Sequence, residues 1–242
     1  MSNRIDRVII TGASSGIGLD LARRFLAEGA SVVINGRDGD KLEGARRSLG
    51  EERRVVAVVG DVSEATTAHA VATAARERLG GVDVLVNNAG IFGAKPFLES
   101  TADDLERFFT TNVKGTYLMT QAVVPLMIAG GGGSIINVGA ALVQQAMTGL
   151  PASAVMASKG GVHALTISLA AELARHGIRV NTLAPGIIRT PLIQDPDSLA
   201  GIQPLGRVGE VRDTSDAVLY LARAAFVTGT TLDVDGGYSH GR

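Results

Sequence analysis

The feature that most constrains the fold is an alternation of short strand-like runs with longer helix-like stretches along the whole chain. Runs rich in β-branched residues, typical of strands, lie at 7–11, 31–35, 54–59, 82–87, 134–138, 178–183 and 231–234. Stretches rich in Ala, Leu and charged residues at helical spacing lie at 18–27, 41–49, 65–79, 103–128, 152–175 and 214–224. Strands that alternate with helices form βαβ units, and the strands of such units pair in parallel. The sequence therefore predicts an α/β fold: a doubly wound parallel sheet of about seven strands with helices on both faces.

Composition and charge limit the classes to which the chain can belong. Its 242 residues suit one continuous core, so we expect a single domain over residues 1–242. A formal net charge of -1 gives no broad positive field, which argues against nucleic acid or a membrane surface as a partner. The absence of cysteine excludes disulfides and sulfur-ligated zinc, and we expect no metal site. Without a secretory pattern at residues 1–7 or a run of roughly 20 apolar residues, a cytoplasmic protein is expected.

Local signals refine this outline. Ser63 and Thr101 can cap the helices that follow them. Pro125 lies inside the stretch 103–128, so we expect that helix to end or kink there. Over residues 190–204 both periodicities give way to Pro, Asp and Gly, which predicts a mobile substrate loop over a site.

A glycine-rich turn follows the first predicted strand. Its spacing is Gly-x-x-x-Gly-x-Gly, at Gly12, Gly16 and Gly18, and a helix comes next. Glycines permit a tight turn and let backbone N–H groups approach a pyrophosphate at the positive end of that helix. Such a turn alone is weak evidence, because an ordinary strand-to-helix turn can also contain glycines.

Further motifs follow in order across almost the whole chain. They are Asn87-Asn88-Ala89-Gly90, Asn112, Asn181 in RVNTLAPG, Pro185-Gly186 with Thr190, and the segment 233–237. Together with the glycine turn, this ordered set resembles the short-chain dehydrogenase/reductase family. The resemblance implies a Rossmann domain, a nicotinamide coenzyme and oxidoreductase activity on a small-molecule carbonyl or alcohol. It also implies a homo-oligomer, either a dimer or a tetramer.

The resemblance also implies which residues bind the coenzyme. The residues expected to bind the coenzyme phosphates and ribose are Gly12, Ser14, Ser15, Ile17 and Gly18. The residues expected to line the coenzyme between its two ends are Asn88, Ala89 and Gly90. The residues expected at the adenine are Asp61 and Val62, and those at the nicotinamide are Pro185, Gly186, Ile188 and Thr190. Asp61 has an alternative reading as a turn residue after a strand. Asn181 is expected to be structural.

The end of the second predicted strand bears on the choice of nucleotide. NAD-selective domains commonly place an acidic residue there to bind the ribose 2′-hydroxyl, and this position resembles Gly36. Arg37 beside it offers a positive fork to a 2′-phosphate, which favours NADP(H). A solvated Arg37 paired with Asp38 is the alternative, so NAD(H) remains possible.

The catalytic pattern of the resembled family is incomplete here. The family places a tyrosine four residues before a lysine on one helix, so that both lie on the same face. Lys159 matches the lysine and Asn112 matches the family's asparagine, but Val155 stands at the tyrosine position and Ala140 at the serine position. A general acid contributes about 10²- to 10⁴-fold, so chemistry by the usual route should be much slower. The resemblance also implies that Lys159 orients the nicotinamide ribose, so coenzyme binding depends on backbone amides, Lys159 and the strand ends rather than on the missing groups.

Another proton source would be needed for turnover. A water held by Lys159 and Asn112 is the first candidate. Side-chain candidates, each of which can equally be pocket wall or surface, are Gln144, Gln145, Thr148 and Ser153. His163 lies one turn after Lys159 on the same helical face, where packing or a subunit contact is the stronger interpretation.

Two functions therefore follow. The first is an NADP(H)-dependent oxidoreductase that reduces a ketone or aldehyde, or oxidises the alcohol, through a non-standard site built on Asn112 and Lys159. The second is a catalytically silent NADP(H)-binding protein with a sensory or scaffolding role.

Overall fold

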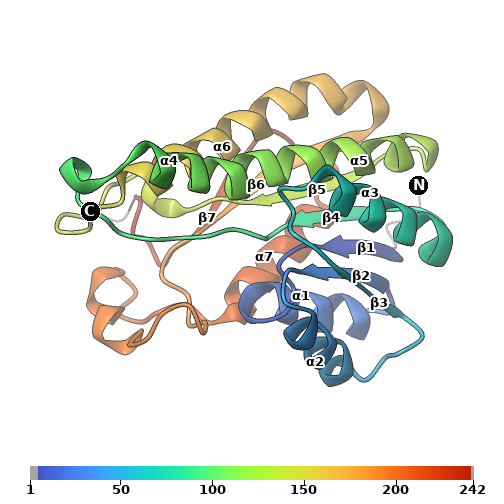
Figure 1. The fold of residues 1–242 in the computed structure, drawn as a ribbon, viewed down its shortest axis with the longest axis horizontal. Helices are drawn as coiled ribbons and strands as arrows, with labels where there is room; N and C mark the ends of the chain where they lie inside the picture. The colour runs from blue at the N-terminus through green and yellow to red at the C-terminus, as the bar shows by residue number, and fades with distance from the viewer. Residues whose placement is uncertain (1–4, 241–242) are drawn as a thin grey trace.

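The computed structural model describes residues 5–240 and contains a seven-stranded sheet (Figure 1). Its strands are β1 (Arg7–Ile10), β2 (Ser31–Gly36), β3 (Val55–Val59), β4 (Val84–Asn87), β5 (Gly133–Val138), β6 (Ile178–Pro185) and β7 (Thr231–Val234). Their order is β3-β2-β1-β4-β5-β6-β7, and every neighbouring pair is parallel. The predicted parallel sheet of about seven strands is confirmed.

Helices cover both faces of this sheet. The α-helices are α1 (Gly16–Ala27), α2 (Gly39–Leu49), α3 (Ala65–Ala74), α4 (Ala102–Phe108), α5 (Gly115–Ala129), α6 (Ser153–Leu173) and α7 (Val211–Arg223). Successive side chains of a strand point to opposite faces. Val8 and Ile10 of β1 accordingly pack in one core with α1, α2 and α7, whereas Ile9 packs in a second core with α3, α5 and α6. Figure 1 shows α4, α5 and α6 together above the sheet and α1 and α2 below it.

The strand order reverses at β1. This strand pairs with β2 on one side and with β4 on the other, so the chain crosses to opposite edges from this point. In open parallel sheets the carboxyl ends of the strands at such a switch point leave a crevice where ligands bind. The glycine turn after β1 and the segment Asn88–Gly90 after β4 both lie at this crevice.

The stretch expected as one helix over 103–128 is divided. A π-helical turn, Phe109–Lys114, separates α4 from α5 and carries Asn112. Helix α5 continues past Pro125 to Ala129, so the expectation that it ends at the proline is wrong. Val123 and Met127, on either side of that proline, are fully buried, and this packing holds the last turn despite the missing N–H donor.

Two other local expectations have different outcomes. Thr101 caps α4 in a capping box with Asp104, as predicted. Ser63 does not cap α3, because its hydroxyl and its N–H both donate to Asp61.

The loop 190–204 contains a 3₁₀ helix, Asp197–Ile202, which its irregular sequence did not predict. Within residues 5–240, no helix is both long and apolar enough to traverse a bilayer.

Candidate active site

The glycine turn is packed tightly against the end of β4. Gly12 has a φ of +63°, and a Cβ atom there would lie 2.8 Å from the Cα of Ala89. Thr11 fixes the contact, because its hydroxyl oxygen accepts hydrogen bonds from the N–H groups of Asn88 and Ala89, both at 3.0 Å. The side-chain amide of Asn88 donates in return to the carbonyl oxygens of Thr11 and Gly12. From the sequence, position 11 is recognisable only as the end of the first strand run, and this positioning role could not be predicted.

Helix α1 begins directly after this turn and faces the crevice. A Cβ atom at Gly18 would lie 2.5 Å from the carbonyl oxygen of Gly12, so only glycine permits this approach of helix and turn. Ser15 occupies the N-cap position without a side-chain cap, which leaves the first-turn N–H groups of α1 open to an anion. These unpaired N–H donors at the positive end of a helix suit the pyrophosphate of a dinucleotide.

The ends of β2 and β3 form the neighbouring part of the site. The Arg37 guanidinium lies 3.7 Å from a carboxylate oxygen of Asp61 and is well exposed. A Cβ atom at Gly36 would lie 3.4 Å from the Ser14 hydroxyl oxygen, so Ser14 lies against Gly36, the residue before Arg37. Partial burial raises the pKa of Asp61, but hydrogen bonds from Ser63 and the charge of Arg37 outweigh it and hold that pKa below its usual value.

The side chains of Lys159 and Asn112 approach Gly90 from the same side. A Cβ atom at Gly90 would lie 3.0 Å from the Lys159 Nζ and 3.1 Å from the Asn112 Oδ1. The Lys159 Nζ donates to the carbonyl oxygen of Val138 at 2.8 Å, at the end of β5. Burial lowers the pKa of Lys159 to about 8. The structure therefore gathers these two predicted residues at the carboxyl ends of β4 and β5.

Asn112 is held by hydrogen bonds on both ends of its amide. Its Oδ1 accepts from the Ile91 N–H at 2.9 Å, and its Nδ2 donates to the Ile91 carbonyl oxygen and to the Ser158 hydroxyl. The Ser158 hydroxyl donates in turn to the Val155 carbonyl oxygen at 2.7 Å. These bonds tie the π-helical turn to α6. Ser158, which sequence analysis missed, was signalled only by its place next to Lys159.

The two positions at which the resemblance leads us to expect hydroxyl groups carry apolar side chains. Val155 is fully buried and packs with Phe108 and Ala152. Ala140 follows β5 and is partly buried. Of the four polar side chains named as alternative donors, three are exposed and Gln145 is partly buried. Gln144, one of the exposed three, donates to Asp233 at 2.5 Å.

His163 lies beside Gly139, directly after β5. A Cβ atom at Gly139 would overlap its Nε2 and would lie 2.8 Å from the Thr182 Cγ2, so the imidazole packs against this glycine. The Nε2 is buried and has no hydrogen-bond partner among the described residues. Burial lowers the pKa of His163, the charge of Asp233 opposes that effect, and the charge of Lys159 adds to it. This position favours packing over proton transfer.

The segment after β6 passes over the glycine turn. A Cβ atom at Gly16 would lie 3.3 Å from the Thr190 Cγ2. Gly186 packs closely against Asp235. A Cβ atom added at this glycine would lie 2.8 Å from the Asp235 Cα. Ile188 is buried and pairs with Gly209 in an isolated bridge. The predicted nicotinamide-end residues therefore share one segment above the crevice.

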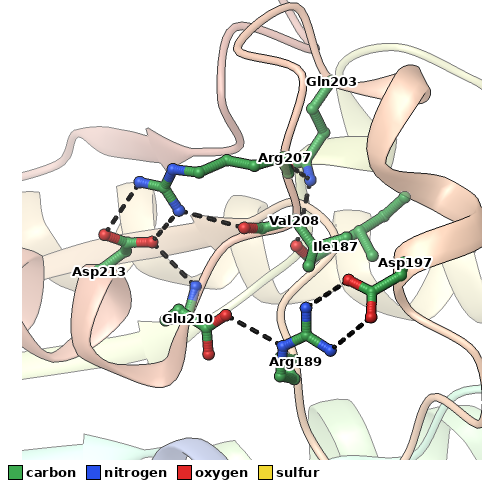
Figure 2. A network of polar contacts seen from close by, with 8 residues as sticks. All are labelled: Ile187, Arg189, Asp197, Gln203, Arg207, Val208, Glu210 and Asp213. Carbon is green, nitrogen blue, oxygen red and sulfur yellow. Dashed lines mark hydrogen bonds and ion pairs between the residues drawn. The ribbon is translucent and has the colours of Figure 1, made fainter.

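A network of ion pairs secures this segment (Figure 2). Arg189 bonds to Asp197 in the 3₁₀ helix and to Glu210 at the start of α7. Arg207 bonds to Asp213 of α7. A surface cleft of about 480 Å³ lies among them, and none of its lining residues is a predicted site residue. Sequence analysis missed this network, since nothing in the spacing of the charges indicates the partner of Arg189.

Comparison with known proteins places the chain in a family. The family model described as short chain dehydrogenase matches residues 6–198. A galactitol 2-dehydrogenase (L-tagatose-forming) of Cereibacter sphaeroides is 40% identical over 95% of this chain and 93% of its own length. An L-rhamnose 1-dehydrogenase (NAD(P)(+)) of a Sphingomonas species is 38% identical over 95% of this chain and 94% of its own length.

Solved structures agree with this placement. The structure of L-sorbose reductase from Gluconobacter frateurii, complexed with NADPH and L-sorbose, matches with a TM-score of 0.91 at 31% identity, covering 99% of each chain. A short-chain type dehydrogenase/reductase from Mycobacterium marinum matches with a TM-score of 0.92 at 32% identity, covering 97% of this chain and 96% of the other. The chain belongs to the short-chain dehydrogenase/reductase family.

Proposed function

We propose that the chain is an NADP(H)-dependent oxidoreductase that interconverts a carbonyl and a hydroxyl group on a small polyhydroxylated compound. The observation that carries this proposal is the convergence of the glycine turn, Asn112 and Lys159 at the carboxyl ends of β1, β4 and β5. The relatives support the substrate class, since they are named for galactitol, L-rhamnose and L-sorbose.

Different groups of residues bind the different parts of the coenzyme. The open N–H groups of α1 bind the pyrophosphate, and Arg37 with the Ser14 hydroxyl binds a 2′-phosphate. Asp61 and Val62 border the adenine, and the segment from Pro185 through Gly186 and Ile188 to Thr190 covers the nicotinamide end. When bound, the nicotinamide supplies or accepts a hydride.

The proposed site is non-standard in its proton chemistry. Val155 and Ala140 can neither donate nor accept a proton, so the two groups that usually polarise the carbonyl are replaced. Asn112 keeps α6 and the π-helical turn in register through Ser158. Lys159 remains as the buried polar group that faces the crevice at Gly90.

The coenzyme assignment is tested with Arg37→Ala. A hydrogen bond to a charged group contributes about 1.5–3 kcal/mol, so NADPH affinity measured by calorimetry should fall about 10- to 100-fold while NADH affinity changes little. Arg47→Ala is the matched control, because it removes the same charge from the exposed far end of α2. Equal losses of NADPH and NADH affinity would contradict the preference.

Activity separates this proposal from the alternative of a catalytically silent NADP(H)-binding protein, which Val155 and Ala140 favour. NADPH consumption is followed at high enzyme concentration with a panel of ketoses, aldoses and simple ketones. Turnover above background that disappears in Lys159→Ala supports the oxidoreductase. Tight NADPH binding without turnover on any compound supports the sensory or scaffolding role, and absence of binding to both coenzymes rejects both functions.

A further inference from the structure

We propose that the side-chain nitrogen of Lys159 is itself the proton donor in reduction and the proton acceptor in oxidation. This inference rests on the proposed function and assigns the step left open by Val155. In the reductive direction, hydride from a reduced nicotinamide reaches the carbonyl carbon, and the C=O π pair moves to the oxygen. One N–H bond of the ammonium breaks, and its proton forms the O–H bond of the product alcohol. The neutral amine regains a proton from water.

The position of the ammonium group is the first argument. Helix α6 places the Lys159 Nζ at the ends of β4 and β5, where a Cβ atom at Gly90 would lie 3.0 Å away. Among the described residues the ammonium makes one hydrogen bond, to the carbonyl oxygen of Val138. An ammonium has three N–H donors, so two remain for a ligand in the crevice. No carboxylate bonds to this nitrogen within residues 5–240 to retain the proton.

The second argument is that the neighbouring polar groups are engaged elsewhere. Both ends of the Asn112 amide bond to Ile91 or Ser158, and the Ser158 proton goes to the Val155 carbonyl oxygen. The Val155 side chain lies in an apolar cluster. The imidazole of His163 packs against Gly139, and burial lowers its pKa, which disfavours its protonated form. Lys159 is thus the group in place at this crevice with a proton to transfer.

The third argument concerns acidity. A lysine at its ordinary pKa gives up a proton too reluctantly to serve well near neutrality, and general acid–base catalysis works best when the pKa lies near the working pH. Burial lowers the pKa of Lys159 to about 8. The ammonium form required for reduction therefore predominates below pH 8, and the amine required for oxidation predominates above it.

Two kinetic outcomes follow from this assignment. The kcat for reduction should fall as pH rises through about 8, whereas the kcat for oxidation should rise over the same interval. Lys159→Arg keeps a positive charge, but its guanidinium does not release a proton in this range. We expect kcat to fall at least 100-fold in that variant while NADPH affinity, measured by calorimetry, stays within about fivefold.

A direct measurement does not require turnover. The chain has four lysines, so the variant Lys41→Arg, Lys95→Arg, Lys114→Arg keeps Lys159 as the one lysine for ¹³C NMR of its ε-carbon. In the coenzyme-free protein this resonance should titrate near pH 8. The same triple variant is the kinetic control, since none of the three positions is in the proposed machinery, and its turnover should match that of the unmodified chain.

The possible results separate this inference from the proposed function. Titration near pH 8, together with loss of turnover in Lys159→Arg and opposite pH profiles in the two directions, supports it. A lysine titration above pH 10, or Lys159→Arg turnover within threefold of the unmodified chain, overturns it and leaves the oxidoreductase proposal standing. Absence of turnover in the unmodified chain on every compound overturns the proposed function, and this inference with it.

Discussion

The buried ammonium of Lys159 should make stability depend on pH. Folding lowers the pKa of this group from 10.5 to about 8, so between these values the unfolded chain binds more protons than the folded one. The free energy of unfolding contributed by this group therefore rises as pH increases from 8 to 10.5. At pH 7 the full penalty of burying the charge is present. The residue proposed to transfer the proton therefore destabilises the fold at neutral pH.

Lys159→Met should consequently stabilise the chain at pH 7. Removing the buried charge gains free energy, and the lost hydrogen bond to the Val138 carbonyl offsets part of it, so we expect a net gain of about 1–3 kcal/mol. Urea unfolding at pH 7 and at pH 10.5 measures the change, which should shrink at the higher pH. Lys114→Met, at an exposed position, is the control. A lower stability of Lys159→Met at pH 7 would contradict the argument.

The packing around Gly139 leaves no room for a side chain. A Cβ atom added there would overlap the His163 Nε2 and crowd the Thr182 Cγ2. Gly139→Ala should therefore destabilise the chain by about 1–3 kcal/mol in thermal or urea unfolding. Adding His163→Ala should recover much of that loss, because it removes the clashing ring. Gly44→Ala is the matched control. Its Cβ would meet open space on α2, and it should stabilise by about 0.5–1 kcal/mol.

At the residue scale, sequence reasoning identified residue types but not their partners. Helical spacing placed Val155, Lys159 and His163 on one face of a helix, which agrees with α6. Spacing could not show that Lys159 reaches Gly90 while His163 packs against Gly139, because both glycines are distant from α6 in the sequence. It could not indicate that Ser158 holds Asn112 either, because that bond joins positions 46 residues apart.

Several contacts hold the segment after β6, and the ion pairs of Arg189 are among them. Arg189 joins the 3₁₀ helix Asp197–Ile202 to the start of α7, and both partners are largely exposed (Figure 2). Exposed ion pairs are weakened by salt. The loop 190–204 should therefore open more readily at high ionic strength.

Arg189→Ala should release this loop. We expect cleavage by chymotrypsin at exposed Leu192 to become several-fold faster, and the Michaelis constant for substrate to rise, with little change in the global free energy of unfolding. High salt should accelerate cleavage of the unmodified chain in the same way. Arg212→Ala removes an exposed arginine from the same cleft without touching the 3₁₀ helix, and its cleavage rate should be unchanged. Equal cleavage rates for both variants would contradict the role of Arg189.

At the element scale, the periodicity of the sequence was sufficient to predict the sheet. Alternating β-branched runs and helical stretches predict parallel pairing, because strands that are joined by helical crossovers within one sheet run in the same direction. The same periodicity missed the π-helical turn at Phe109–Lys114, since an inserted residue shifts the apolar pattern only slightly. It also misjudged Pro125, where burial of the flanking side chains outweighs the absent hydrogen bond.

At the scale of the whole molecule, one helical layer exposes four large apolar side chains. Leu105, Phe109, Tyr117 and Ile167 are each more than a third exposed, and they come from α4, the π-helical turn, α5 and α6. These elements lie together on one side of the sheet in Figure 1. Exposed apolar side chains can mark an interaction surface. We predict that this layer makes a contact in the oligomer expected from the sequence.

Ile167→Lys tests that expectation. Ile167 is 61% exposed in the middle of α6, so a lysine there leaves the monomer's core untouched but places a charge in any contact that α6 makes with a second copy. A symmetric contact between two copies presents the substituted position twice, and the repulsion of the two charges adds to the cost of burying them. Light scattering coupled to size exclusion should therefore report a smaller assembly, with unchanged thermal unfolding at low protein concentration. Ser48→Lys, at an exposed polar position of α2 in the other helical layer, is the control expected to keep the original mass. An unchanged mass for Ile167→Lys would locate the subunit contact elsewhere, because a contact through this part of α6 would have to bury the added charges.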